Sequence, residues 1–83
     1  MTTQTQQPLA DQLLDLLASE YEAPEGTTTE TSFELLGFDS LVLVEVAVAL
    51  SQRYVITVTD EELQEAGNVA GTVELLEAKG VRA

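Results

Sequence analysis

The sequence has 83 residues, which is enough for one compact domain and too few for two. Its 15 acidic and 3 basic side chains give a formal net charge of −12, which repels nucleic acids and anionic membranes and favours basic protein partners. Cysteine and histidine are absent from the sequence, which excludes a disulfide framework, a thiolate zinc site and a histidine general base. We therefore expect a single domain that binds other proteins and is not an enzyme.

Both ends of the chain are expected to lie outside the domain. Residues 1–7 are polar and lack the positive segment and apolar run of a secretory signal, which predicts a flexible N-terminus. Residues 8–80 are expected to form the domain, and residues 81–83 a short C-terminal tail. No segment reaches the roughly 20 apolar residues of a membrane span, so the cytoplasm is the expected compartment.

A leucine pattern predicts the first helix, over about residues 8–21. Pro8 is expected in its first turn, and the helix ends before Pro24 because a residue that precedes proline is pushed out of helical geometry. The leucines that share one face of this helix are Leu9, Leu13, Leu16 and Leu17.

A long connection is expected over residues 22–32, which contain two helix breakers and no apolar period. A short turn should follow it. Thr31 and Glu34 have the spacing of a capping box, Phe33 begins an apolar group that would hold the turn to the core, and Gly37 would end it.

Residues 40–53 are ambiguous by periodicity alone, because their valines favour a strand. The length of the segment and the position of Arg53 near its end favour a helix, and we predict one. The expected core face is Leu43, Val46, Ala47 and Leu50, which leaves an exposed stripe of Leu41, Val44 and Val48. Such a stripe indicates a protein contact, although packing beneath the long connection is an open alternative.

The last third of the chain predicts two more helices. Residues 54–58 have no second strand to pair with and are expected to be an extended connection. Thr59 and Glu62 have capping-box spacing before a very short helix that Gly67 ends, and Asn68 caps a final helix that stops near Lys79. The predicted fold is an all-α, irregular four-helix bundle, and the long first connection is expected to let the first two helices run in the same sense or cross.

The segment from Gly37 to Leu41 is the strongest candidate site. Asp39 and Ser40 are favoured residues at a helix N-terminus, so capping alone could explain them. The same position also suits a serine that carries a phosphodiester, because helix N-terminal amides stabilise an anion.

Residues 36–41, Leu-Gly-Phe-Asp-Ser-Leu, resemble the modification motif of acyl and peptidyl carrier proteins. The likeness covers about residues 8–80 and includes Glu45, the acidic start of the third helix at residues 60–63 and the start of the fourth helix at Asn68. It implies an acyl-carrier-like bundle without activity of its own. In such a carrier, a phosphopantetheinyl transferase uses coenzyme A and Mg²⁺ to attach 4′-phosphopantetheine to Ser40, which Asp39 presents, and the arm holds acyl groups as thioesters.

The resemblance also implies partners that dock beside the serine: the transferase and an acyltransferase, ketosynthase or other acyl-loading or acyl-accepting enzyme with basic or apolar patches. The expected contact residues are Leu41, Val44, Glu45, Val48, Glu61 and Glu62. Reversing any of these glutamates to lysine is expected to weaken docking with little loss of stability. We expect a monomer that binds neither nucleic acid nor membrane, and no metal site, because the acids near Glu61 lack calcium-loop spacing.

Glu45 is the only charged residue among positions 41–50, whereas fatty-acid carriers commonly have further acids there. This departure and the bulky Phe38 favour a discrete carrier of polyketide or mixed polyketide–peptide biosynthesis. An aminoacyl or peptidyl carrier is an open alternative, as is an unmodified acidic helical domain that binds a basic partner.

Overall fold

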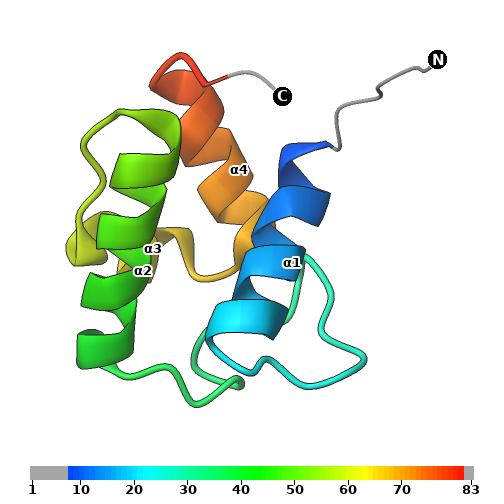
Figure 1. Cartoon of the computed structure of the whole chain (residues 1–83). Coiled ribbons are helices and arrows are strands. Elements are labelled where there is room, and N and C mark those ends of the chain that lie inside the picture. The colour runs from blue at the N-terminus through cyan, green and yellow to red at the C-terminus, as the bar shows by residue number, and fades with distance from the viewer. Residues whose placement is uncertain (1–7, 82–83) are drawn as a thin grey trace, which may run out of the picture.

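The structure is a computed structural model that describes residues 8–81. Its helices are α1 (Leu9–Glu20), α2 (Ser40–Tyr54), α3 (Asp60–Ala66) and α4 (Val69–Ala78) (Figure 1). No strand occurs among the described residues, so the predicted all-α fold with a long first connection and a very short third helix is confirmed. The flexible N-terminus predicted for residues 1–7 lies outside the described residues, as do the last two residues of the predicted tail.

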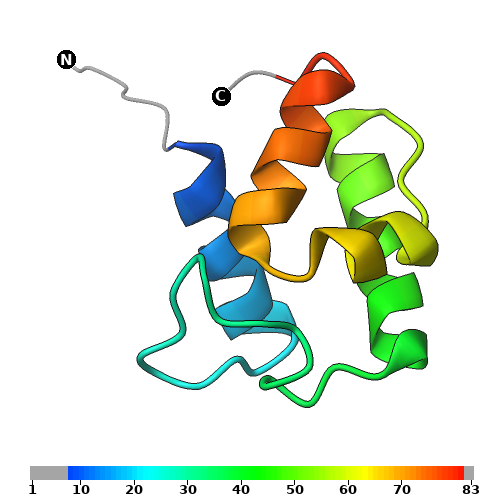
Figure 2. The ribbon, with the colours of Figure 1, turned by 180° about the vertical axis from the view of Figure 1, so that it is seen from behind.

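The helices pack in a chain of contacts, with α2 on α3, α3 on α4 and α4 on α1. α1 runs in the opposite sense to both α2 and α4 (Figures 1 and 2), so the alternative in which the first two helices run in the same sense is wrong. The first connection is long because it passes the other side of the bundle before α2 begins. Its backbone reaches the junction of α3 and α4, where Ala70 N donates to Thr29 O at 2.9 Å and Phe33 N donates to Gly67 O at 2.8 Å.

The ends of the helices largely follow the sequence signals. Thr59 and Glu62 form the predicted capping box of α3, with backbone-to-side-chain distances of 3.1 and 3.2 Å. Asn68 caps α4 by accepting a hydrogen bond from Gly71 N at 2.8 Å. Pro8 lies immediately before α1 rather than in its first turn, and its carbonyl accepts a hydrogen bond from Gln12 N at 3.0 Å.

The capping box predicted for Thr31 and Glu34 does not form. Thr31 Oγ1 accepts a hydrogen bond from Thr28 N at 3.0 Å, so its hydroxyl closes a turn that precedes it. Ser32 Oγ accepts instead from Leu35 N, at 3.1 Å. Serine and threonine hydroxyls can both accept a hydrogen bond from an unpaired backbone amide. Here Ser32, one residue after Thr31, accepts the bond from Leu35 N.

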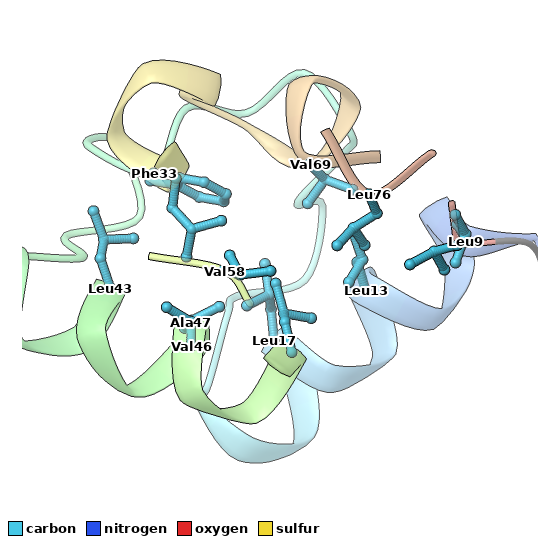
Figure 3. Close-up of a cluster of buried hydrophobic side chains, with 13 residues drawn as sticks. Leu9, Leu13, Leu17, Phe33, Leu43, Val46, Ala47, Val58, Val69 and Leu76 are labelled. Carbon is cyan, nitrogen blue, oxygen red and sulfur yellow. The ribbon is translucent and has the colours of Figure 1, made fainter. Parts of the chain in front are cut away.

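The core is aliphatic apart from Phe33 and draws on all four helices (Figure 3). The four core residues predicted for α2 are all buried: Leu43, Val46, Ala47 and Leu50. Leu41, Val44 and Val48 are exposed to 67%, 41% and 51%, so the alternative that they pack beneath the long connection is wrong. Phe33 is buried as expected and holds the turn before α2 to the core.

Two polar contacts complete the packing. Tyr54 on α2 donates its hydroxyl hydrogen to Gln12 Oε1 on α1 at 2.6 Å. Ser51 Oγ donates to Ala47 O at 2.8 Å and accepts from Val58 N at 2.9 Å, which holds the extended connection between α2 and α3 against α2. Within residues 8–81, no helix is long and apolar enough to cross a membrane.

Candidate functional site

Ser40 is the first residue of α2, and it is exposed. Asp39 precedes it as the N-cap residue, with an extended backbone, and its Oδ1 accepts a hydrogen bond from Val42 N at 3.0 Å. The serine hydroxyl therefore lies at the positive end of the helix dipole, beside amides that have no partner within the helix. A phosphate attached to this hydroxyl would be in a favourable electrostatic position.

The turn before Ser40 is fixed by aromatic packing. The ring of Phe38 stacks on that of Phe33 at a centroid distance of 6.1 Å and meets the edge of Tyr21 at 6.4 Å. Phe38 N donates to Phe33 O at 3.0 Å, and Gly37 allows the sharp turn by adopting a φ of 78°. These contacts hold the start of α2 relative to both the core and the end of α1.

A hollow of about 380 Å³ opens beside Ser40. Its apolar lining comes from Phe33, Phe38 and Leu43, and its polar lining includes Gln64 of α3. The remaining lining residues are Ser32, Glu34 and Gly67. A larger hollow of about 570 Å³ lies away from the serine, between the start of α1 and the end of α4, so the smaller one is relevant to chemistry at Ser40.

The candidate site fits a phosphate-linked group, although two negative charges lie close to it. Glu34 lines the hollow and Asp39 adjoins Ser40, so two carboxylates lie near the hydroxyl. The carboxylate of Asp39 is directed to Val42 N, where it caps the helix. Because Ser40 is exposed, an attached phosphate can project into solvent, where like-charge repulsion is screened.

Glu45 lies on the side of α2 that faces the end of α1. The pKa of the Tyr21 hydroxyl is raised first by partial burial and then by the charges of Glu45 and Glu20. Glu45 is itself exposed. It therefore borders the exposed side chains of Leu41 and Val48, and the structure brings these three predicted contact residues together on one helix.

The two glutamates predicted for docking on α3 differ from each other. Glu61 is exposed, whereas Glu62 caps its own helix and forms a 3.0 Å ion pair with Lys79 at the end of α4. The hydrogen bond from Lys79, followed by that from Thr59 N, lowers the pKa of the Glu62 carboxyl. Reversal of Glu62 to lysine would break both contacts. The prediction that such a reversal costs little stability therefore applies better to Glu61 than to Glu62.

Sequence reasoning did not find the lining residues Ser32 and Gln64, because neither belongs to a motif. The aromatic cluster did have a sequence signal. The chain holds only two tyrosines, two phenylalanines and no tryptophan, and three of these four rings pack together just before Ser40.

Comparison with known proteins agrees with this geometry. The family model described as "Phosphopantetheine attachment site" matches residues 11–76. Acyl carrier protein 1, chloroplastic, of Hordeum vulgare is 30% identical over 76 residues, which cover 89% of this chain and 51% of the barley protein, so this chain spans about half of that relative. The acyl carrier protein of Rhodococcus erythropolis (strain PR4 / NBRC 100887) is 36% identical over 64 residues, which are 72% of this chain and 70% of the relative. No solved structure matches significantly.

The fold and the match define a small helical carrier of a phosphopantetheine group. The chain belongs to the acyl carrier protein family. Its cofactor is therefore phosphopantetheine, and its role is that of a carrier rather than an enzyme, as the resemblance implied.

Proposed function

We propose that this chain holds a biosynthetic acyl intermediate on a 4′-phosphopantetheine arm attached to Ser40, and that it does so in polyketide biosynthesis. The observation that carries the assignment of Ser40 is its place as the exposed first residue of α2, capped by Asp39. When bound, the arm supplies the thiol that this cysteine-free chain lacks, and acyl groups are held on it as thioesters.

Attachment requires the Ser40 hydroxyl to attack the phosphate of coenzyme A that bears the pantetheine. The serine oxygen would lose its proton to a base of the transferase and bond to that phosphorus, while the phosphoanhydride bond of coenzyme A breaks and adenosine 3′,5′-bisphosphate leaves with its electron pair. The chain contributes the position of the hydroxyl and the dipole of α2, which stabilises the negative charge of the diester formed. Asp39 fixes the start of the helix and so presents the serine to the transferase.

The test is the intact mass of the protein after incubation with coenzyme A, Mg²⁺ and a broad-specificity phosphopantetheinyl transferase. We expect one phosphopantetheinyl group on the wild type and none on Ser40→Ala. Ser32→Ala is the matched control, because Ser32 lines the same hollow, and it should be modified like the wild type. Modification of Ser40→Ala would remove the assignment. A folded wild type that takes up no arm would favour an unmodified acidic domain.

Docking of enzymes is proposed on the exposed side of α2, where Leu41, Val44 and Val48 lie beside Glu45. Exposed aliphatic side chains grouped on one helix are typical of protein contacts. The net charge of −12 would attract partners with basic patches. We propose the transferase, an acyltransferase and a ketosynthase as such partners, with the cytoplasm as the compartment.

The polyketide assignment is supported by the scarcity of charge on α2 and by the bulky Phe38 within the motif. Its test uses the protein with the arm attached. Transfer of a malonyl group from malonyl coenzyme A by a polyketide acyltransferase is the expected result. Loading of an amino acid by an adenylating enzyme, without malonyl transfer, would instead assign an aminoacyl carrier.

A further inference from the structure

α1 and α2 do not pack directly on each other. The contacts between helices run from α2 to α3, from α3 to α4 and from α4 to α1, whereas the Cα atoms of α1 and α2 lie more than 8 Å apart. The two helices are joined instead near their ends, by the hydrogen bond from Tyr54 to Gln12 and by the edge contact between the rings of Tyr21 and Phe38. The ring of helix contacts is therefore open between α1 and α2 (Figures 1 and 2).

A hollow of about 460 Å³ lies in this opening, and we name it the α1–α2 groove. Its two apolar lining residues, Leu16 of α1 and Ala49 of α2, are half-buried, and Leu16 also packs against the core. The other lining residues are exposed: Asp15, Ser19, Glu20, Gln52 and Arg53. The groove thus combines an apolar base with a polar, charged rim.

The two walls of the groove carry opposite charges. Asp15 and Glu20 are on the α1 wall, and Arg53 is on the α2 wall. Arg53 is one of only three basic residues in the sequence, and it forms no ion pair with any carboxylate of residues 8–81, where the ion pair found joins Lys79 to Glu62. The charges of both walls are therefore available to a partner.

These features favour an amphipathic helix as the occupant. Residues 8–81 contain no strand, so an extended peptide finds no sheet edge to pair with. A helix presents an apolar ridge between two polar flanks, which matches an apolar groove whose walls differ in charge. A second copy of this chain is disfavoured, because two molecules with a net charge of −12 repel each other. A helix of a different protein is therefore the better match.

We propose that the α1–α2 groove binds an amphipathic helix of a partner protein. Its lysine or arginine side chains face Asp15 and Glu20, and its aspartate or glutamate side chains face Arg53. Arg53 lies 13 residues beyond Ser40 on α2, which is about 20 Å along the helix. The bound helix therefore leaves the serine free, so that a partner can hold the protein while other enzymes act at Ser40. Binding at this groove does not depend on modification of Ser40.

The experiment is a selection against the unmodified protein from a displayed library of helical peptides of about 16 residues, roughly four turns. The apolar ridge is fixed as leucine and alanine, and both flanks vary among lysine, glutamate and glutamine. We expect selected peptides to carry lysine on one flank and glutamate on the other, and to shift the backbone amide signals of Leu16 and Ala49 in NMR spectra. The proposal is overturned if no peptide is selected, if lysine is preferred on both flanks, or if the shifts are confined to Leu41 and Val48.

Arg53→Gln separates recognition in the groove from a general attraction of charge. For a selected peptide with equal numbers of lysines and glutamates, we expect Kd to rise about two- to fivefold in a fluorescence polarisation titration, as for loss of an exposed ion pair. Ala78→Glu is the matched control, because it makes the same change in net charge at an exposed position outside the groove. Its Kd should stay near that of the wild type. An equal change of Kd in both variants would overturn the role of Arg53.

Ser19→Trp tests whether the groove itself is filled. Ser19 is exposed, so the new ring occupies the hollow without removing a core contact. We expect Kd to rise about tenfold or more, as for loss of a well-packed interface contact. Ala18→Trp is the matched control, because Ala18 is an exposed neighbour that lines a different hollow, and it should bind the peptide like the wild type. Unchanged binding by Ser19→Trp would place the peptide elsewhere and overturn the proposal.

A last set of measurements separates this inference from the proposed function. Arm attachment, followed by intact mass, should proceed at the same rate with and without saturating peptide, and inhibition would overturn the claim that the groove leaves Ser40 free. A wild type that binds the peptide but takes up no arm would overturn the proposed function alone. A dimer of the wild type in light scattering that Ser19→Trp dissociates would make a second copy the occupant and overturn the choice of a partner helix.

Discussion

α2 carries aliphatic side chains both toward the core and toward solvent. The inner face holds Leu43, Val46, Ala47 and Leu50, all of them buried. The outer face holds Leu41, Val44 and Val48, all of them exposed. The two sets have similar chemistry and nearly opposite environments.

This contrast teaches that hydrophobicity alone does not assign a residue of this helix to the core. α3 and the turn at Phe33 cover one side of α2, and no other element of the described chain covers its outer side. The inner residues therefore hold the fold together, while the outer residues are available to partners. Substitutions on the two faces should separate stability from docking.

The largest effect is expected from Leu50→Ala on the inner face. Truncating a fully buried leucine typically costs about 2 to 5 kcal/mol, which approaches the roughly 3 to 5 kcal/mol available to a domain of this size. Urea unfolding followed by circular dichroism should show a protein that is largely unfolded or has a much lower midpoint. Val48→Ala on the outer face should stay within about 0.5 kcal/mol of the wild type. Equal losses would show that the outer face also supports the fold.

A smaller effect is expected at Asp39, where one side chain serves both roles. Asp39→Ala removes the cap of α2 and should cost about 1 kcal/mol of unfolding free energy. Asp39→Asn keeps a capping oxygen and should be nearly as stable as the wild type. If the negative charge helps to present Ser40, Asp39→Asn should still lower kcat/KM of the transferase. A wild-type kcat/KM in Asp39→Asn would limit this residue to capping.

The smallest effect is expected on α3, where Glu62 makes contacts within the fold and its neighbour Glu61 is exposed. Glu62→Gln should lower stability at neutral pH, because the paired carboxylate has a depressed pKa, and Glu61→Gln should not. A carboxyl whose folded pKa lies below its ordinary value of 4.5 stabilises the fold above that value and loses this contribution as the pH falls. The stability difference between Glu62→Gln and the wild type should therefore shrink toward pH 3.

Urea titrations of both variants at pH 7 and pH 3 measure this dependence. Glu61→Lys should keep its stability and raise KM of the transferase at low salt, because Glu61 is exposed and unpaired by any described lysine. A pH-independent difference for Glu62→Gln would contradict the role of the ion pair.

Much of the fold could be predicted from the sequence because its helices have strong local signals. The leucine spacing of α1 and the caps at Thr59 and Asn68 gave elements close to those observed. The burial of Leu43 and Leu50 followed from helical periodicity once α2 was assigned as a helix. Ser40 was found because a motif coincided with the start of that helix.

The rest depends on contacts between distant residues. The direction of α1 relative to α2 follows from the detour of the first connection, which is bonded to the α3–α4 junction through Phe33 and Ala70. No local pattern encodes such bonds. Gln64 lines the hollow beside Ser40 only because α3 packs across α2. The left-handed conformation in which Val55 ends α2 has no sequence signal, because glycine is the usual residue there.

The packing of α1 on α4 has a consequence for biosynthesis of the chain itself. The helix that packs most closely on the first one is the last one, and the turn that precedes Ser40 is bonded to Gly67. A ribosome that has released only the first half of the sequence therefore exposes α1 without the surface that buries its leucines. Contacts between residues so far apart form late in folding, because a long loop must close first. Ser40 thus reaches its final setting only after α4 has been translated, and addition of the arm should follow synthesis of the chain rather than accompany it.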